Sequence, residues 1–265
     1  ISQKKDSTFT KILAVIRSQE YFGKMEILVQ GEKKGLAENM NIGIKRAKHP
    51  IVITLHGDCV PEGRYWLQNL IAPFKNPDVV ATVSKVRMPN EIWKRFDIFT
   101  KSLSIQEKGV ITPLLDEKGC AYRKSALEKA GYFNEEDFKT AGEDFDLYLK
   151  LKEKGIIFYP DAIVVHHDFL TLERRLKKIY RNANGFGTLF KMYGFSMPGW
   201  QYGFLQAIPF LGLIPTALSY PFIKAPLYFI PYIIISPVKH VLYTYGFWKG
   251  FWKGSQTVRI IPDIA

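Results

Sequence analysis

The sequence has few cysteines and no paired-cysteine motif. Of its 265 residues, only Cys59 and Cys120 are cysteines. They are far apart and lack the spacing of paired zinc ligands, which argues against a zinc site and against a disulfide framework. This usage is typical of a protein from a reducing compartment. The first residues, Ile1 to Asp6, also lack the features of a secretory signal peptide.

Acidic residues are scarce relative to basic ones. The chain has 37 lysines and arginines against 25 aspartates and glutamates, a net charge of +12. This excess favours an anionic partner: a nucleic acid, a substrate that carries a diphosphate, or an anionic membrane face. No nucleic-acid-binding motif accompanies the charge, so we expect no nucleic-acid partner and favour the other two.

The order of predicted elements indicates an α/β fold. With 23% charged and 47% hydrophobic residues, the chain is globular and long enough for one large domain with an appendage. Helices predicted at 9–19, 36–47 and 64–74 alternate with strands at 26–30, 51–55 and 79–86, which implies parallel β-α-β units. For residues 91–118 we expect a helix and a mobile loop. Downstream, the patterns predict strands at 119–123, 156–159 and 162–166, and helices at 124–130 and 141–154.

The C-terminal part has a different composition. After a basic helix predicted at 172–191, neither Tyr202–Ile223 nor Ala225–Val238 contains a charged residue. Recurring prolines argue against one straight spanning helix. Residues 239–253 mix aromatic and basic side chains, as membrane–water interfaces do. The segment fits proline-broken helices in the interface, a hairpin inserted into the bilayer, or a helical subdomain with an apolar core.

A short polar motif, His56-Gly57-Asp58, follows the predicted strand 51–55. Ligands of open α/β sheets bind just outside the carboxyl ends of strands. Gly57 allows close backbone approach, and His56 and Asp58 are two candidate metal ligands. The alternative is an ordinary loop in which Asp58 is a turn residue.

Two further groups are candidates for chemistry. Glu143 and Asp144 stand at a predicted helix start, where acids also cap free backbone N–H groups. Capping accounts for one acid better than for three within four residues. His166 ends the last predicted strand, where a neutral imidazole can bind a metal, although a hydrogen-bonded or exposed histidine pair with His167 explains it too.

Taken in order, these motifs resemble a family 2 inverting glycosyltransferase with the GT-A fold, over roughly residues 9–190. The matching segments are Gly35–Ile44, His56–Pro61, Gly119–Leu127, Gly142–Leu147 and Val165–His166. The resemblance implies a Rossmann-like, mostly parallel central sheet flanked by helices. It also implies a nucleotide-sugar donor, GDP-mannose or a UDP-hexose, a divalent Mn²⁺ or Mg²⁺ ion, and direct displacement at the anomeric carbon.

The resemblance also implies roles for particular residues. Asp58 matches the last acid of the family's Asp-x-Asp motif, and with His166 it would bind the metal. Asp144 matches the catalytic base and Glu143 its partner. His56 and Gly57 would contact the donor. Gly119, Cys120 and Ala121 would line the acceptor side.

The sequence departs from the family pattern at three points. His56 occupies the position of the first acid in Asp-x-Asp. Gln30 and Glu32, which we assign to donor binding, stand where the family has an acid for the nucleotide base and ribose. The family's first strand would precede Ile1.

We therefore expect a membrane-associated enzyme with a catalytic domain at 1–190 on the cytoplasmic side. Residues 191–265 would form apolar and aromatic helices that dock on the membrane surface, and the acceptor would be lipid-linked or a glycan. One alternative, favoured by His56, is a catalytically inactive member that acts as a membrane-bound scaffold. A second is a nucleotidyltransferase, but Gly31–Gly35 is too short and too acidic for its phosphate loop.

Overall fold

The computed structural model describes residues 7–31, 34–139 and 141–254, and the chain divides into two compact units. Unit 1 comprises Ile1–Ile92, Lys108–Glu135 and Glu143–Asp168. Unit 2 comprises Trp93–Glu107, Glu136–Gly142 and Phe169–Ala265. The boundary that composition suggests at residue 190 falls inside a helix of unit 2, so the units differ in extent from the two predicted domains.

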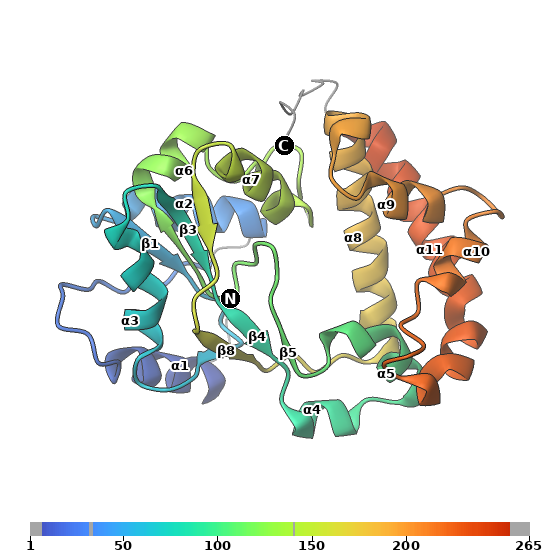
Figure 1. Cartoon of the computed structure of the whole chain (residues 1–265), viewed down its shortest axis with the longest axis horizontal. Coiled ribbons are helices and arrows are strands. Elements are labelled where there is room, and N and C mark those ends of the chain that lie inside the picture. Colours follow the sequence, from blue (N-terminus) through green and yellow to red (C-terminus); the bar gives the residue numbers. More distant parts are fainter. Residues whose placement is uncertain (1–6, 32–33, 140, 255–265) are drawn as a thin grey trace. The chain divides into compact units, whose positions relative to one another are not determined.

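Unit 1 contains two four-stranded sheets (Figure 1). The strands of sheet A run in the order β1 (Ile51–Thr54), β6 (Cys120–Arg123), β3 (Val79–Val83), β7 (Ile156–Phe158). β6 is antiparallel to both β1 and β3, whereas β3 and β7 are parallel. β1 is therefore an edge strand of this sheet.

Sheet B has the order β2 (Cys59–Pro61), β8 (Ile163–His166), β4 (Lys85–Arg87), β5 (Val110–Ile111). β8 is antiparallel to β2 and parallel to β4, and β4 is antiparallel to β5. The predicted α/β class is confirmed. The described strands do not form the mostly parallel sheet that we expected, because only two of their pairings are parallel.

The predicted strand 79–86 is divided at Ser84. This residue lies between β3 and β4, where the chain passes from sheet A to sheet B. Ser84 is buried, and its Oγ accepts a hydrogen bond from Trp66 Nε1 at 3.1 Å. One continuous run of strand-forming residues thus contributes β3 to sheet A and β4 to sheet B.

Helices cover sheet A on both sides. α2 (Leu36–Arg46), α6 (Lys124–Ala130) and α7 (Glu143–Lys152) share one core cluster with Tyr122, whereas α3 (Trp66–Ile71) shares the other with Ala121. Successive side chains of a strand point to opposite faces, which explains this division. α1 (Ser7–Arg17) contacts β2.

Two expectations for residues 26–30 and 91–118 need correction. Residues 26–30 form no strand: Ile27, Leu28 and Val29 are exposed, and no described strand pairs with them. The segment 91–118 is more ordered than expected. It contains α4 (Asn90–Arg95), α5 (Ile98–Ser104), a short 3₁₀ helix at Ile105–Glu107, and β5.

Unit 2 is helical. The basic helix is confirmed as α8 (Leu172–Tyr193), followed by the short helices α9 (Trp200–Gln206) and α10 (Leu213–Leu218) and the long α11 (Phe229–Lys253). α11 continues through Pro237. None of the described helices has the length and hydropathy of a membrane-crossing segment.

Glycines allow α8 and α11 to approach closely. A Cβ atom on Gly187 would lie 1.9 Å from the carbonyl oxygen of Phe247, and one on Gly250 would lie 1.9 Å from that of Asn184. No side chain can occupy these positions without separating the two backbones.

We predict that Gly187→Val lowers the free energy of unfolding by about 1–3 kcal/mol, since overpacking strains a close-packed interface. Urea unfolding followed by circular dichroism measures the change. Gly43→Ala is the matched control, because its Cβ would meet only the Gln30 Cβ, at 4.0 Å. It should be neutral or stabilising by up to about 1 kcal/mol. Equal stability of the Gly187 variant and the wild type would contradict the packing argument.

Candidate active site

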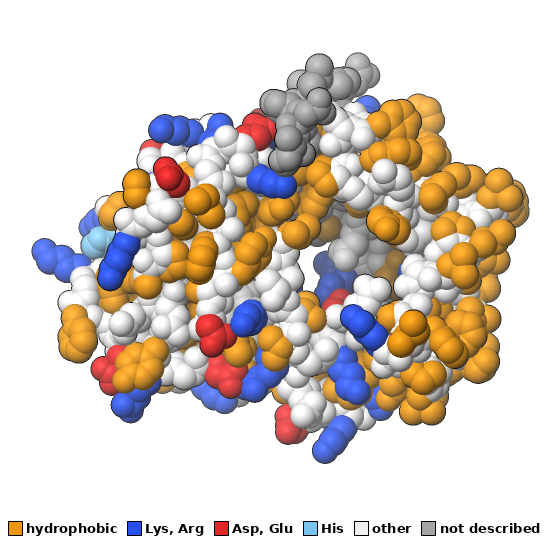
Figure 2. Space-filling view, in the orientation of Figure 1, with side chains coloured by type: hydrophobic (Ala, Val, Ile, Leu, Met, Phe, Trp, Pro, Cys, Tyr) orange, Lys and Arg blue, Asp and Glu red, His pale blue; other side chains and the backbone are white. Residues whose placement is uncertain are grey.

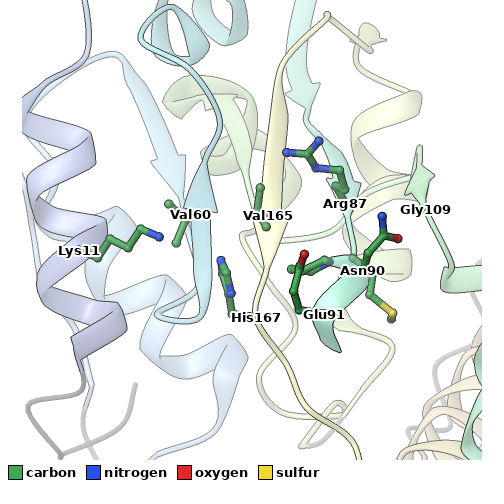
Figure 3. A pocket seen from close by; sticks show the side chains of 10 residues that line it. Lys11, Val60, Arg87, Asn90, Glu91, Gly109, Val165 and His167 are labelled. Carbon is green, nitrogen blue, oxygen red and sulfur yellow. The ribbon is translucent and has the colours of Figure 1, made fainter. Parts of the chain in front are cut away.

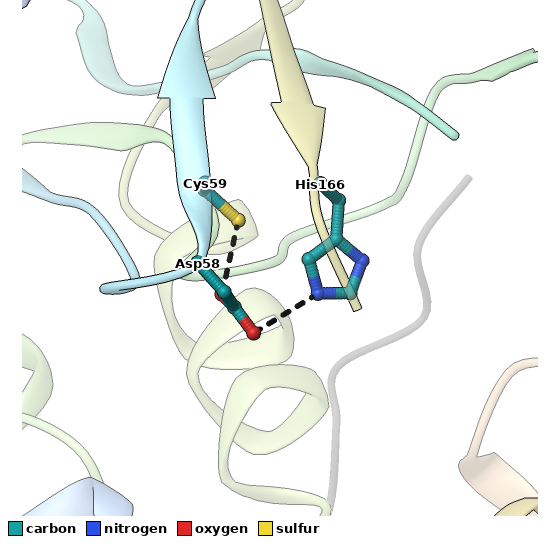
Figure 4. Close-up of side chains that lie close together, drawn as sticks. All are labelled: Asp58, Cys59 and His166. Carbon is teal, nitrogen blue, oxygen red and sulfur yellow. Dashed lines mark hydrogen bonds and ion pairs between the residues drawn. The ribbon is translucent and has the colours of Figure 1, made fainter. Parts of the chain in front are cut away.

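The pairing of β2 with β8 brings together residues that are distant in sequence. Cys59 lies opposite His166, and the His167 N–H donates to the Asp58 carbonyl oxygen at 2.8 Å. The Asp58 carboxylate lies 3.4 Å from His166 Nε2 (Figure 4). With the Cys59 thiol they form a group whose ligand atoms lie within 4.8 Å of one another. The predicted Asp58–His166 pair is thus formed by backbone pairing.

The chemistry of this group fits a hard divalent cation. Burial alone would raise the pKa of Asp58, but the hydrogen bond and charge of His166 outweigh it and hold the pKa well below its usual range. Burial raises the pKa of the Cys59 thiol far above its ordinary value, so the sulfur stays protonated. Mn²⁺ and Mg²⁺ prefer oxygen and imidazole to sulfur. Asp58 and His166 are therefore the ligands that fit such an ion.

His56 and Gly57 precede this group in the same loop. Burial lowers the pKa of His56, which favours the neutral imidazole. Its Nε2 atom is shielded from solvent and has no hydrogen-bond partner among the described residues. A Cβ on Gly57 would meet nothing within 4 Å, so there is open space beside the backbone at this position. His56 thus offers an unsatisfied buried nitrogen near the loop that the sequence assigns to the donor.

Our sequence analysis missed an ion pair next to the site. Asp116 and Lys118 pair with each other, and both influence the pKa of His56 and of Asp144. They belong to the loop before β6, which we had expected to be mobile. A run of three charged residues immediately before a buried strand was the signal for them. The charges of this pair therefore act both on His56, in the loop of the candidate metal site, and on Asp144, the candidate base.

Asp144 has the electrostatics of a general base. Burial and the charge of Asp116 raise its pKa to about 6, although the Phe145 N–H donates to its Oδ1 at 2.8 Å and opposes the shift. The hydrogen bond is the expected capping interaction at the start of α7. A base with a pKa near the working pH transfers protons efficiently. Capping and base chemistry are therefore compatible at this residue.

Buried acids surround Asp144. Glu143 is 5% exposed and Glu117 is 3% exposed. Burial, followed by the charge of Asp144, raises the pKa of Glu117 well above its ordinary value. Burial thus favours the protonated form of Glu117, and its Oε1 has no hydrogen-bond partner within the described part of the chain.

The other predicted site residues do not join the Asp58–His166 pair in the described part of the chain. Gln30 is tied to α2, where its Oε1 accepts from Arg46 at 3.2 Å, while Glu32 lies outside the described residues. Cys120 and Ala121 are fully buried in β6, between β1 and β3. Their side chains therefore lie in the core rather than on an acceptor-side surface. A Cβ on Gly119 would lie 2.8 Å from Val164 Cγ1, so close packing requires this glycine.

Sheet B also has a cavity of about 510 Å³ on a different face (Figure 3). Val60 and Val165 form its wall, one residue away from Cys59 and His166, so strand alternation directs them to the opposite side. Lys11, Arg87 and His167 contribute its basic groups. The cavity is thus separate from the Asp58–His166 pair.

The fold is similar to that of solved glycosyltransferases. A mannosyltransferase from Pyrobaculum calidifontis, PcManGT, in complex with GDP-Man and Mn²⁺, aligns with a TM-score of 0.55 at 14% identity, over 96% of this chain and 86% of that chain. GalNAc-T7 with UDP, GalNAc and Mn²⁺ gives a TM-score of 0.47 at 14% identity, over 96% and 47%. S. aureus TarS 1–349 gives 0.38 at 14% identity, over 91% and 87%. The alignment with PcManGT shows that the chain shares the fold of this mannosyltransferase.

One family model matches part of the sequence. Residues 6–131 match glycosyl transferase family 2. The match includes Asp58 but ends before Asp144 and His166, whose placement comes from the structure. No curated protein is significantly similar to the chain in sequence.

The raised pKa of Asp144 predicts a pH-dependent stability. Its folded-state pKa of about 6 exceeds the ordinary value of 3.8, so its contribution to stability is greatest below pH 3.8 and is lost as the pH rises through 6. Asp144→Asn should therefore raise the free energy of unfolding by up to about 3 kcal/mol at pH 8 and by little at pH 4. Denaturant unfolding at both pH values measures this, with Asp161→Asn, at an 86% exposed side chain, as the control. The same gain at both pH values would contradict the burial effect.

Proposed function

We propose that the chain transfers a hexose from a nucleotide-diphosphate sugar, GDP-mannose or a UDP-hexose, to a hydroxyl acceptor with inversion. The acceptor would be lipid-linked or a glycan. The observation that carries this proposal is the strand pairing that sets Asp58 beside His166. The ion pair Asp116–Lys118 acts both on His56, in the same loop as Asp58, and on Asp144. A metal-binding group and a base of suitable pKa are the two components that such a transfer requires.

In this proposal different residues of the chain serve different steps of the transfer. Asp144, as a carboxylate, accepts the proton of the acceptor hydroxyl. The acceptor oxygen forms a bond to the anomeric carbon from the face opposite the leaving group, while the bond from that carbon to the diphosphate oxygen breaks. Attack from the opposite face inverts the configuration. The nucleoside diphosphate leaves with the electron pair of the broken bond.

The leaving group needs positive charge as its bond breaks. Asp58 and His166 would hold a divalent cation, and a bound Mn²⁺ or Mg²⁺ supplies charge stabilisation to the diphosphate. Lys118 adds a fixed positive charge near the same loop, as its effect on the pKa of His56 indicates. Donor complexes with Mn²⁺ in PcManGT, which shares the fold, support this choice of metal and substrate.

We predict that Mn²⁺ and GDP or UDP together raise the melting temperature of the wild type by a few degrees, since a ligand that binds only the folded state stabilises it. Asp58→Asn and His166→Ala should each abolish the metal-dependent part of the shift, and Asp161→Asn should retain it. Thermal-shift titrations with and without Mn²⁺ measure the effect. An undiminished shift in the Asp58 variant would place the metal elsewhere, and no shift with any nucleotide sugar would favour the inactive scaffold.

We also predict that Asp144→Asn lowers kcat by about 10²–10⁴-fold, which is the usual contribution of a general base. The Mn²⁺-dependent thermal shift should persist in this variant, because the change removes proton transfer and leaves the metal ligands intact. For the wild type, kcat should rise with pH through about 6 as Asp144 loses its proton. Radiolabelled sugar transfer across this pH range provides the measurement, and retained turnover in the variant would refute the base role.

A further inference from the structure

The outer face of α11 is apolar and exposed along its whole length. It spans 25 residues, about 37 Å. At 100° per residue, six of its exposed apolar side chains fall within about 80° of one another around the helix. They are Ile230, Ile234, Val238, Val241, Tyr245 and Trp252, between 44% and 74% exposed.

The inner face of the same helix is already occupied. Gly246, Phe247 and Gly250 are buried and pack against α8. The polar Lys239 is also directed inward: its Nζ donates to Tyr232 at 2.7 Å and to Ser219 at 3.2 Å. α11 therefore has two apolar faces. One packs against α8, and the other is the exposed stripe.

A rigid turn adds to this surface. Between α9 and α10, Phe210 is 91% exposed and Leu211 is 68% exposed. Phe210 has φ of 60°, a left-handed conformation that is uncommon for a residue with a side chain. Backbone hydrogen bonds on both sides of it fix the turn, from Leu211 to Pro209 at 2.7 Å and from Gly212 to Ile208 at 2.8 Å. The turn thus holds two large apolar side chains in solvent.

Further exposed apolar side chains follow on α10 and in the turn after it. Ile214, Leu218 and Ile223 are 63%, 78% and 95% exposed. In the space-filling view, hydrophobic side chains gather over α9, α10 and α11 (Figure 2). Soluble monomers seldom expose contiguous apolar patches larger than a few hundred Å². We call the stripe, the turn and these residues the apolar surface.

The charge of the same region identifies its partner. Between Phe169 and Gly254 the sequence has ten lysines and arginines and a single acidic residue, Glu173. Lys224 and Lys253 are exposed next to Ile223 and Trp252. Lysines and aromatic rings at the edge of an apolar face suit the headgroup region of a bilayer.

A second copy of the chain is a poorer partner than a bilayer. It would bring together two copies of a unit with the same excess of basic residues, whereas anionic lipid compensates that charge. We infer that the apolar surface of α9–α11 docks unit 2 on an anionic lipid bilayer, with Phe210, Ile223 and the α11 stripe entering the headgroup boundary and Lys224 and Lys253 contacting lipid phosphates. This inference is independent of the proposed donor, metal and base.

Vesicle co-sedimentation of the full chain tests it, with phosphatidylcholine vesicles with and without phosphatidylglycerol. The wild type should bind the anionic vesicles more tightly. The double variant Phe210→Glu/Ile223→Glu should lower the partition coefficient at least about tenfold, because burying one large apolar side chain contributes about that factor. Phe22→Glu is the matched control: its side chain is fully exposed, lies in unit 1, and should leave binding unchanged.

Lys224→Glu separates the charge contribution from the apolar one. It should weaken binding to anionic vesicles and leave binding to phosphatidylcholine alone unchanged, and the wild type should show the same selective loss at high salt. Circular dichroism checks that each variant is folded. Undiminished binding of the double variant would overturn the inference. The inference would also be overturned if the wild type bound neither kind of vesicle but self-associated through the same residues in sedimentation velocity. The partner would then be a second copy of the chain.

Discussion

The candidate site depends on the antiparallel pairing of two short strands, β2 and β8. This pairing sets Cys59 opposite His166, and a backbone hydrogen bond from His167 to Asp58 extends it by one residue. More than a hundred residues separate the two strands in sequence. It is this register that brings the Asp58 carboxylate and the His166 imidazole close enough to bind one cation. Sheet B thus positions the two candidate metal ligands, while the ion pair Asp116–Lys118 influences the pKa of His56 and of Asp144.

Burial then gives similar groups different chemistry. Asp58 is 46% exposed beside His166 and remains an anion, while Asp144 is shielded near Asp116 and holds its proton up to about pH 6. For Glu117, which is deeper still, burial raises the pKa well above its ordinary value. Three carboxyl groups in one region thereby acquire three protonation behaviours from their surroundings. This separation allows one to bind a cation and another to accept a proton.

Much of this could be predicted from the sequence, because the signals were local. Helical periodicity located α2, α6 and α8, and a strand end followed by His56-Gly57-Asp58 located the loop of the candidate metal site. The failures concern long-range pairing. Residues 26–30 have the composition of a strand, yet a strand exists only where a neighbour supplies hydrogen bonds. No local pattern revealed that the chain changes sheets at Ser84, or that Cys120 and Ala121 would be enclosed between β1 and β3. Asp116 and Lys118 were missed because their importance depends on what lies beside them.

The close approach of α8 and α11 at Gly187 and Gly250 has a mechanical consequence. Because backbone touches backbone there, neither helix can slide or roll on the other without a clash. The two helices therefore form one rigid pair, with basic side chains on α8 and apolar ones along the exposed stripe of α11. A displacement of that stripe would move α8 as well, because the backbones themselves are in contact.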